Sequence, residues 1–141
     1  MKRLPILTLV ESRIKMYDYM ATLVRVVDGD TVDCDIDLGF GVWLKNQRIR
    51  LYGIDAPETR TRDLEEKKAG IAAKLRLIAL MKDRFVLTSI KDKKGKYGRI
   101  LGIINVPVIK ELDKNGKKTK HIFVDVNKKL VEEGHAKKAD Y

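Results

Sequence analysis

Three short stretches of this sequence concentrate acidic and basic side chains: Asp28-Gly29-Asp30-Thr31, the segment 50–58, and Lys96-Tyr97-Gly98-Arg99. Each stretch also has an ordinary explanation, since Asp-Gly-Asp is a common turn and Tyr-Gly-Arg is a common polar loop. Together they supply what hydrolysis of a phosphodiester requires: ligands for a cation, a base for water, and donors for the charge that develops on the phosphate. The sequence therefore predicts a hydrolytic phosphate site.

The acidic members of these stretches favour a hard cation. Asp30 and Asp55 offer carboxylate oxygens, the ligands that calcium prefers. The chain has two histidines and one cysteine, Cys34, which make a poor ligand set for zinc. We therefore expect Ca²⁺ or a similar cation at Asp30 and Asp55, with Glu58 free to act as the base.

The basic members favour a bound phosphate. Arg50 and Arg99 carry planar guanidinium groups that bind phosphate oxygens through two N–H donors, whereas lysine offers only a point charge. Alternation over residues 47–53 places Arg48 and Arg50 on one face of a predicted strand. We expect Arg50 and Arg99 to share the charge of the transition state.

The overall charge points to a polyanionic partner. The chain has 141 residues, enough for one domain, and its 30 Lys and Arg outnumber 20 Asp and Glu for a net charge of +10. Such an excess favours nucleic acid, although many basic proteins do not bind it. The single cysteine, which we expect to lie half-buried in a strand, excludes an internal disulfide, so nothing indicates an oxidising compartment.

The same composition gives little support to a membrane role. No apolar run approaches the ~20 residues of a spanning helix. The apolar residues after Met1 are few and no small-residue cleavage site follows them, so we expect no signal peptide. These features favour a cytoplasmic or virus-encoded intracellular protein, and we expect it to be a monomer.

The elements that must position these residues are five strands and two helices. Branched residues and turn signals predict strands over residues 22–27, 31–36, 47–53, 85–90 and 100–106. Leu64, Ile71, Leu75, Ile78 and Leu80 predict an amphipathic helix over residues 63–81, capped by Asp63. An Asn-Gly turn predicts a lysine-rich hairpin over 110–121, and a short helix is predicted over about 126–133. A small closed barrel satisfies this order of elements.

From about residue 19 to residue 139, the chain resembles the staphylococcal nuclease family. The resemblance lies in VVDGDTVD at 26–33, RIRLYGIDAPE at 48–58, KYGR at 96–99 and VNKKLVEEGHAKKA at 126–139. It implies an α+β fold: a five-stranded OB-fold β-barrel with a helix after the third strand and a short C-terminal helix. Residues 1–18 would form an N-terminal arm and residues 19–141 the nuclease domain.

The resemblance also implies calcium-dependent, sugar-nonspecific cleavage of DNA and RNA that leaves 3′-phosphates. Asp30 and Asp55 are similar to the family's calcium carboxylates, with the backbone carbonyl of Ala56 as a further ligand. Asp28 is similar to an acid that lies behind these ligands. The metal site expected from the residue types therefore coincides with the one that the resemblance implies.

The catalytic groups are implied in the same way. Arg50, Glu58 and Arg99 are similar to the family's catalytic trio, in which the glutamate assists water and the arginines hold the scissile phosphate. Lys96 and Tyr97 are similar to contacts with a terminal phosphate of the substrate. The chain ends at Tyr141, before the region where the family's better-known members carry tyrosines that line a base-binding face, so base preference is left open.

Two other functions compete with this prediction. Related barrels that have lost their catalytic residues serve as nonenzymatic nucleic-acid-binding modules, and a basic barrel can also serve as a protein scaffold. Every catalytic position is filled here, which favours the enzyme. The lysine-rich hairpin is first interpreted as a solvated hairpin and second as a DNA clamp.

Overall fold

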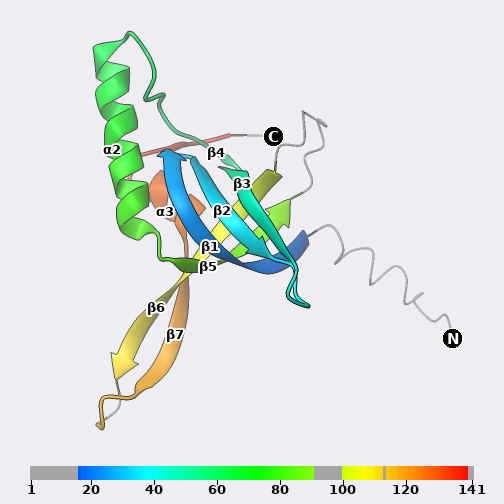
Figure 1. The fold of residues 1–141 in the computed structure, drawn as a ribbon. Helices are drawn as coiled ribbons and strands as arrows, with labels where there is room; N and C mark the ends of the chain where they lie inside the picture. Colours follow the sequence, from blue (N-terminus) through cyan, green and yellow to red (C-terminus); the bar gives the residue numbers. More distant parts are fainter. Residues whose placement is uncertain (1–15, 91–99, 113, 140–141) are drawn as a thin grey trace, which may run out of the picture.

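A closed barrel of five strands forms the centre of the computed structural model, which describes residues 16–90, 100–112 and 114–139 (Figure 1). The strands are β1 (Met16–Asp28), β2 (Thr31–Asp37), β3 (Trp43–Leu51), β5 (Arg84–Ile90) and β6 (Ile100–Leu112). They pair antiparallel in the order β3-β2-β1-β5-β6, and parallel pairing of β3 with β6 closes the barrel. The predicted α+β OB-fold arrangement is confirmed.

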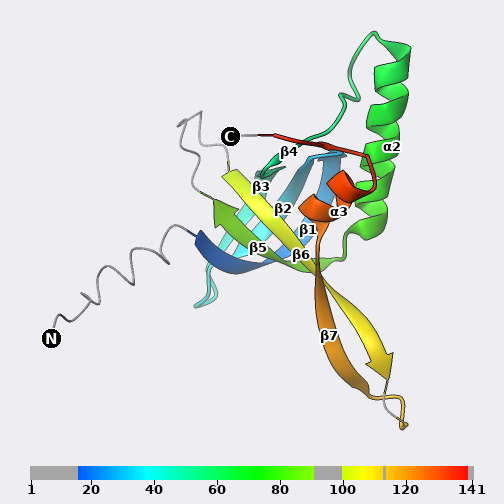
Figure 2. The same ribbon diagram turned by 180° about the vertical axis from the view of Figure 1, so that it is seen from behind.

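The remaining elements lie outside the barrel wall. They are the two-residue strand β4 (Ile54–Asp55), helix α2 (Leu64–Leu80), β7 (Lys118–Asp125), helix α3 (Val126–Glu132) and β8 (Lys137–Lys138). Strand β7 pairs with the second half of β6, and this hairpin projects away from the barrel (Figure 2). No helix in the described residues is long and apolar enough to cross a membrane.

The first strand is longer than predicted. It runs from Met16 to Asp28, whereas the predicted strand covers residues 22–27. Residues 16–22 of β1 pair with residues 84–90 of β5, and this ladder extends the strand toward the N-terminus. Residues 1–15 lie outside the described part of the chain.

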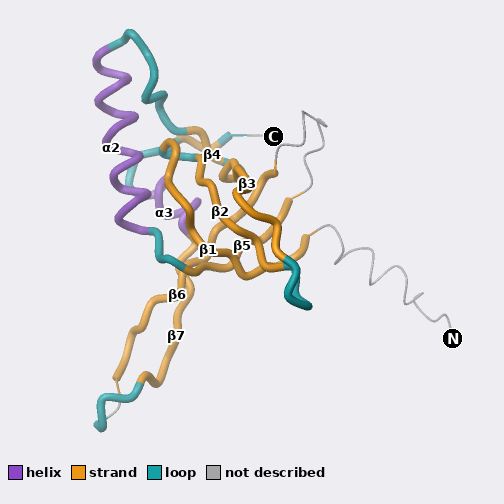
Figure 3. The backbone as a smooth tube through the Cα atoms, in the orientation of Figure 1, coloured by secondary structure: helices purple, strands orange, loops and turns teal. Residues whose placement is uncertain are grey.

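Helix α2 lies along one side of the barrel (Figure 3), and its ends agree with the prediction. The carboxylate of Asp63 accepts hydrogen bonds from the backbone N–H groups of Glu65 and Glu66, which caps the first turn. The predicted apolar face was wrong. Four of the five residues that defined it are exposed, whereas small residues and one leucine face the barrel: Leu64, Ile71, Leu75 and Ile78 are exposed, and Gly70, Ala73 and Leu77 are buried.

The close approach of α2 to the barrel explains why small residues face it. A Cβ atom on Gly29, in the turn between β1 and β2, would lie 2.7 Å from the Cβ of Ala73. The helix therefore packs directly on this turn, and large side chains would hold it away. The apolar pattern of the sequence emphasised large residues, while the contact with the barrel depends on small ones.

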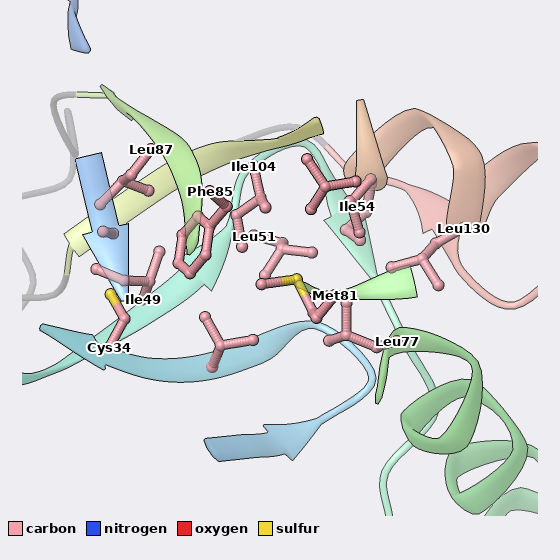
Figure 4. Close-up of a cluster of buried hydrophobic side chains, with 14 of the residues drawn as sticks. Cys34, Ile49, Leu51, Ile54, Leu77, Met81, Phe85, Leu87, Ile104 and Leu130 are labelled. Atoms are coloured by element: carbon pink, nitrogen blue, oxygen red, sulfur yellow. The ribbon is translucent and has the colours of Figure 1, made fainter. Parts of the chain in front are cut away.

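The barrel interior is filled by aliphatic and aromatic side chains from the strands and from helices α2 and α3 (Figure 4). Phe85, Leu51 and Ile104 lie at its centre, and Leu77 of α2 closes one end. Cys34 is fully buried in this core, rather than half-buried as predicted, and burial raises the pKa of its thiol to about 12. The thiol is therefore protonated at neutral pH.

A buried asparagine joins α3 to the barrel. The side-chain amide of Asn127 donates hydrogen bonds to the carbonyl oxygens of Tyr52 (2.9 Å) and Gly102 (3.0 Å), and its oxygen accepts one from the N–H of Ile104 (3.2 Å). Because Tyr52 directly follows β3, these bonds hold the end of the strand that carries Arg50.

Candidate active site

The turn between β1 and β2 carries Asp30, whose carboxylate is buried and held on both sides. One oxygen accepts a hydrogen bond from the backbone N–H of Ala56 (2.8 Å), and the other accepts one from the hydroxyl of Thr31 (2.9 Å). The carbonyl oxygen of Asp30 also accepts a hydrogen bond from the N–H of Leu51 (2.8 Å). These bonds bring the turn, the end of β3 and the segment after β4 together.

Arg50 joins the two acids that were predicted to bind a cation. Its guanidinium forms an ion pair with Asp30, and its Nη2 lies 3.0 Å from Oδ1 of Asp55. The side chain of Asp30 is 7% exposed and that of Asp55 is 65% exposed. The site thus has one carboxylate anchored in the barrel wall and one that faces solvent, and both contact the same cationic group.

The segment after β4 carries Glu58 along the edge of this cluster. The hydroxyl of Thr59 donates a 2.5 Å hydrogen bond to Asp28 at the end of β1, which attaches the segment to the barrel. Glu58 is exposed and lines a cavity of about 550 Å³. Residues from three parts of the chain surround it: Asp55, Ala56, Pro57, Glu66, Ala69, Gly134, His135, Ala136 and Lys137.

The structure therefore brings six of the predicted site residues to one end of the barrel, namely Asp28, Asp30, Arg50, Asp55, Ala56 and Glu58. The other three, Lys96, Tyr97 and Arg99, lie outside the described residues. The described chain resumes at Ile100, which pairs with Ile49, the neighbour of Arg50 in β3.

The donor chemistry of this cluster fits a hard cation. Asp30 and Asp55 provide carboxylate oxygens, and the carbonyl of Ala56 belongs to the residue whose N–H already binds Asp30. Oxygen donors of this kind suit calcium, which commonly completes its ligand shell with water. Within the described ranges, no three His, Cys, Asp or Glu side chains form a group that could hold a metal ion.

Two features of this region were missed by the sequence analysis. His135 and Lys137 line the Glu58 cavity although they follow α3, and no local pattern connects them with residues 55–58. Asp33 is buried on β2 and binds both Arg25 and Arg48. Alternation in β2 gave no signal for the second feature, because Asp33 lies between two buried residues and the period of two predicts that its side chain faces the other side of the strand.

A glycine of α2 sets the position of Glu58. A Cβ atom on Gly70 would collide with the carbonyl oxygen of Glu58 and would lie 2.7 Å from its carbonyl carbon. We expect Gly70→Ala to displace the Glu58 segment and to lower the rate of the predicted phosphodiester cleavage at least about tenfold, since small misplacements of catalytic groups are costly. Initial rates with a DNA substrate measure this effect.

The control for Gly70→Ala is Lys68→Ala, at an exposed position of the same helix. Alanine favours a helix over glycine by about 1 kcal/mol, so propensity alone predicts that Gly70→Ala is more stable. A variant that was more stable and cleaved DNA at the wild-type rate would show that the close contact does not position Glu58.

Comparison with known proteins identifies the family of this chain. The model of the family described as staphylococcal nuclease homologue matches residues 48–141, more than half of the chain. The chain belongs to the staphylococcal nuclease homologue family. The match to this family includes Arg50, Asp55 and Glu58, while Asp28 and Asp30 precede it and reach the site through the β1–β2 turn.

Two curated relatives of this staphylococcal nuclease homologue are similar over much of its length. Micrococcal nuclease of Shigella flexneri is 31% identical over 119 residues, which cover 84% of this chain and 58% of the relative. Protein ParB of Escherichia coli is 37% identical over 82 residues, which cover 58% of this chain and 39% of the relative. The chain thus spans less than two thirds of the length of each relative.

Proposed function

We propose that this chain is a calcium-dependent nuclease that hydrolyses phosphodiester bonds of DNA and RNA and leaves 3′-phosphates. The observation that carries the proposal is Arg50 in contact with both Asp30 and Asp55, beside the cavity that Glu58 lines. Membership of the staphylococcal nuclease homologue family and similarity to a protein named micrococcal nuclease support it.

The acids hold the cation in this proposal. Asp30, Asp55 and the carbonyl of Ala56 would bind Ca²⁺, which when bound supplies positive charge that stabilises the phosphate in the transition state. Asp30 is pre-positioned by Ala56 and Thr31, so little ordering is needed on binding. Asp28 acts indirectly, because its bond to Thr59 holds the segment that carries Glu58.

Glu58 orients a water molecule for in-line attack and accepts its proton. The water oxygen forms a bond to phosphorus as the bond from phosphorus to the 5′ oxygen breaks. The leaving 5′ oxygen takes a proton from solvent, and the products are a 3′-phosphate and a 5′ alcohol. The exposed carboxylate of Glu58 lines a cavity open to substrate, and this placement suits the role.

The arginines stabilise the negative charge that grows on the phosphate oxygens. Arg50 is positioned by β3, whose end is held by Asn127. Arg99 directly precedes Ile100, and we propose that it supplies the second guanidinium. Lys96 and Tyr97 are proposed to bind a terminal phosphate of the substrate.

Glu58→Gln tests the catalytic function against the rival function of a nonenzymatic nucleic-acid-binding module. Loss of a general base typically costs 10²–10⁴-fold, so we expect plasmid cleavage in the presence of calcium to fall at least about 10²-fold. Binding of the plasmid should persist. Glu65→Gln, at an exposed acid in the first turn of α2, is the matched control and should cleave like the wild type.

The same experiment separates the two functions. Wild-type protein that bound the plasmid without cleaving it would favour the binding module. Cleavage that survived in Glu58→Gln at the wild-type rate would remove Glu58 from the mechanism.

A further inference from the structure

A second cavity, lined by Asp28 and Thr59 and by several basic residues, lies next to the Glu58 segment. It has a volume of about 340 Å³ and lies between the barrel and α2. Four cationic side chains line it together with one acid, one hydroxyl and two valines: Arg25, Arg48, Arg60, Lys74, Asp28, Thr59, Val26 and Val27. None of the four cationic residues belongs to the catalytic groups described above.

Two of these arginines are held by a buried carboxylate. The Nε of Arg25 lies 2.7 Å from Oδ2 of Asp33, and Arg48 donates to Asp33 through Nε (2.9 Å) and Nη2 (3.2 Å). The side chain of Asp33 is 4% exposed, whereas those of Arg25 and Arg48 are 63% and 59% exposed. The anchor is therefore inside the barrel wall, and the guanidinium groups face solvent.

This anchoring leaves donors for another partner. The bonds to Asp33 use one N–H group of Arg25 and two of Arg48, out of five on each guanidinium. The hydrogen bond from Arg48, together with that from Arg25, holds the pKa of Asp33 below its usual range, although burial opposes the shift. Asp33 therefore stays ionised at neutral pH and keeps both arginines in place.

We propose that this cavity binds a backbone phosphate of the nucleic acid, separate from the phosphate that is cleaved. The four cationic side chains outnumber the two carboxylates, Asp28 and Asp33, so the cavity has an excess of positive charge. Guanidinium forks that are already positioned bind phosphate oxygens with little loss of side-chain freedom. The inference rests on the proposed nuclease function.

The position of the cavity fits a continuous strand of nucleic acid. Thr59 lines the basic cavity, and its neighbour Glu58 lines the candidate catalytic cavity. A polynucleotide that occupies the catalytic cavity can therefore continue across residues 58–60 into the basic one. Such an interaction carries no sequence information, as expected for a nuclease without sequence preference.

The test measures binding rather than cleavage. We would titrate a fluorescently labelled single-stranded 12-mer DNA with protein that carries Glu58→Gln, in several salt concentrations and without divalent ions. Adding Arg25→Gln and Arg48→Gln is expected to weaken binding at low salt at least about fivefold. The slope of log affinity against log salt should decrease by about 0.7 for each phosphate of the single strand that the variant no longer neutralises.

Two further variants make this result specific. Removing both arginines leaves Asp33 buried without its partners, so Arg60→Gln with Lys74→Gln provides a second pair that keeps the ion pairs of Asp33. This pair should also reduce the slope. Lys82→Gln with Arg84→Gln removes the same charge from exposed positions outside the cavity and serves as the control.

Three outcomes would overturn the inference. The first is that both double variants of the cavity bind the 12-mer with the same affinity and the same salt slope as the control double variant. The second is binding of inorganic phosphate that the cavity variants abolish without any change for the 12-mer, which would assign the cavity to a free anion. The third is no binding of the 12-mer by the parent protein. The nuclease proposal fails separately, through the cleavage experiment with Glu58→Gln.

Discussion

Replacing Arg50 with alanine is expected to lower the rate of DNA cleavage by at least about 10²-fold, the usual cost of losing one donor to a transition state. The affinity for Ca²⁺ should remain equal or increase. The structural reason is that Arg50 contacts Asp30 and Asp55, so its removal takes away a positive charge next to the proposed ligands. Initial rates and calorimetric titration with calcium measure the two effects.

This pair of measurements distinguishes a catalytic arginine from a structural one. If Arg50 served only to hold the two acids together, its removal would weaken calcium binding and turnover together. Arg84→Ala, at an exposed position of β5, is the control and should alter neither. A rate equal to that of the wild type would remove Arg50 from the mechanism.

Removal of divalent cations is expected to reduce cleavage to background, and added Ca²⁺ should restore it. The proposed ligands predict a matched variant. Asp55→Asn should weaken calcium binding at least about tenfold, since replacing even a group that only hydrogen-bonds to a metal ligand lowers the metal affinity by about that factor. Because the side chain of Asp55 is 65% exposed, this change should leave folding intact.

The readouts for this prediction are cleavage and the melting temperature. Calcium should raise the melting temperature of the wild-type protein, and the increase should be smaller in Asp55→Asn. Asp83→Asn, at another exposed acid, should respond to calcium like the wild type. Full cleavage in the presence of a chelator would contradict the calcium dependence.

Local signals in the sequence predicted much of the fold. Branched residues, turns and the Asp63 cap identified all five barrel strands and both ends of α2, because these signals depend on neighbours along the chain. The ranges of β1, β3 and β6 extend beyond those predicted. The face of α2 that packs on the barrel was wrong for a physical reason. Its neighbours are Gly29 and the Glu58 segment, and the sequence pattern alone does not show how close these backbones come.

For the candidate site, too, the sequence predicted one part, and only the tertiary structure decided the other. The types and order of Asp30, Arg50, Asp55 and Glu58 are enough to predict a phosphate site, since the reaction itself requires a cation, a base and a cationic donor. The tertiary structure decided that Arg50 touches both acids. The arrangement requires the β1–β2 turn, the end of β3 and the segment after β4 to meet, and the bonds from the N–H groups of Leu51 and Ala56 to Asp30 join them.

The sequence by itself determined the chemistry that we propose for this protein, because residue type sets charge, donor geometry and affinity for a cation. Only the tertiary structure decided which charges are buried and which face solvent. Arg25, Asp33 and Arg48 show this most clearly. A register shift in β1 between Leu23 and Arg25, together with the pairing of Asp33 and Arg48 across β2 and β3, sets two arginines on one buried carboxylate. Burial depends on packing among strands distant in the chain, so no local pattern could predict it.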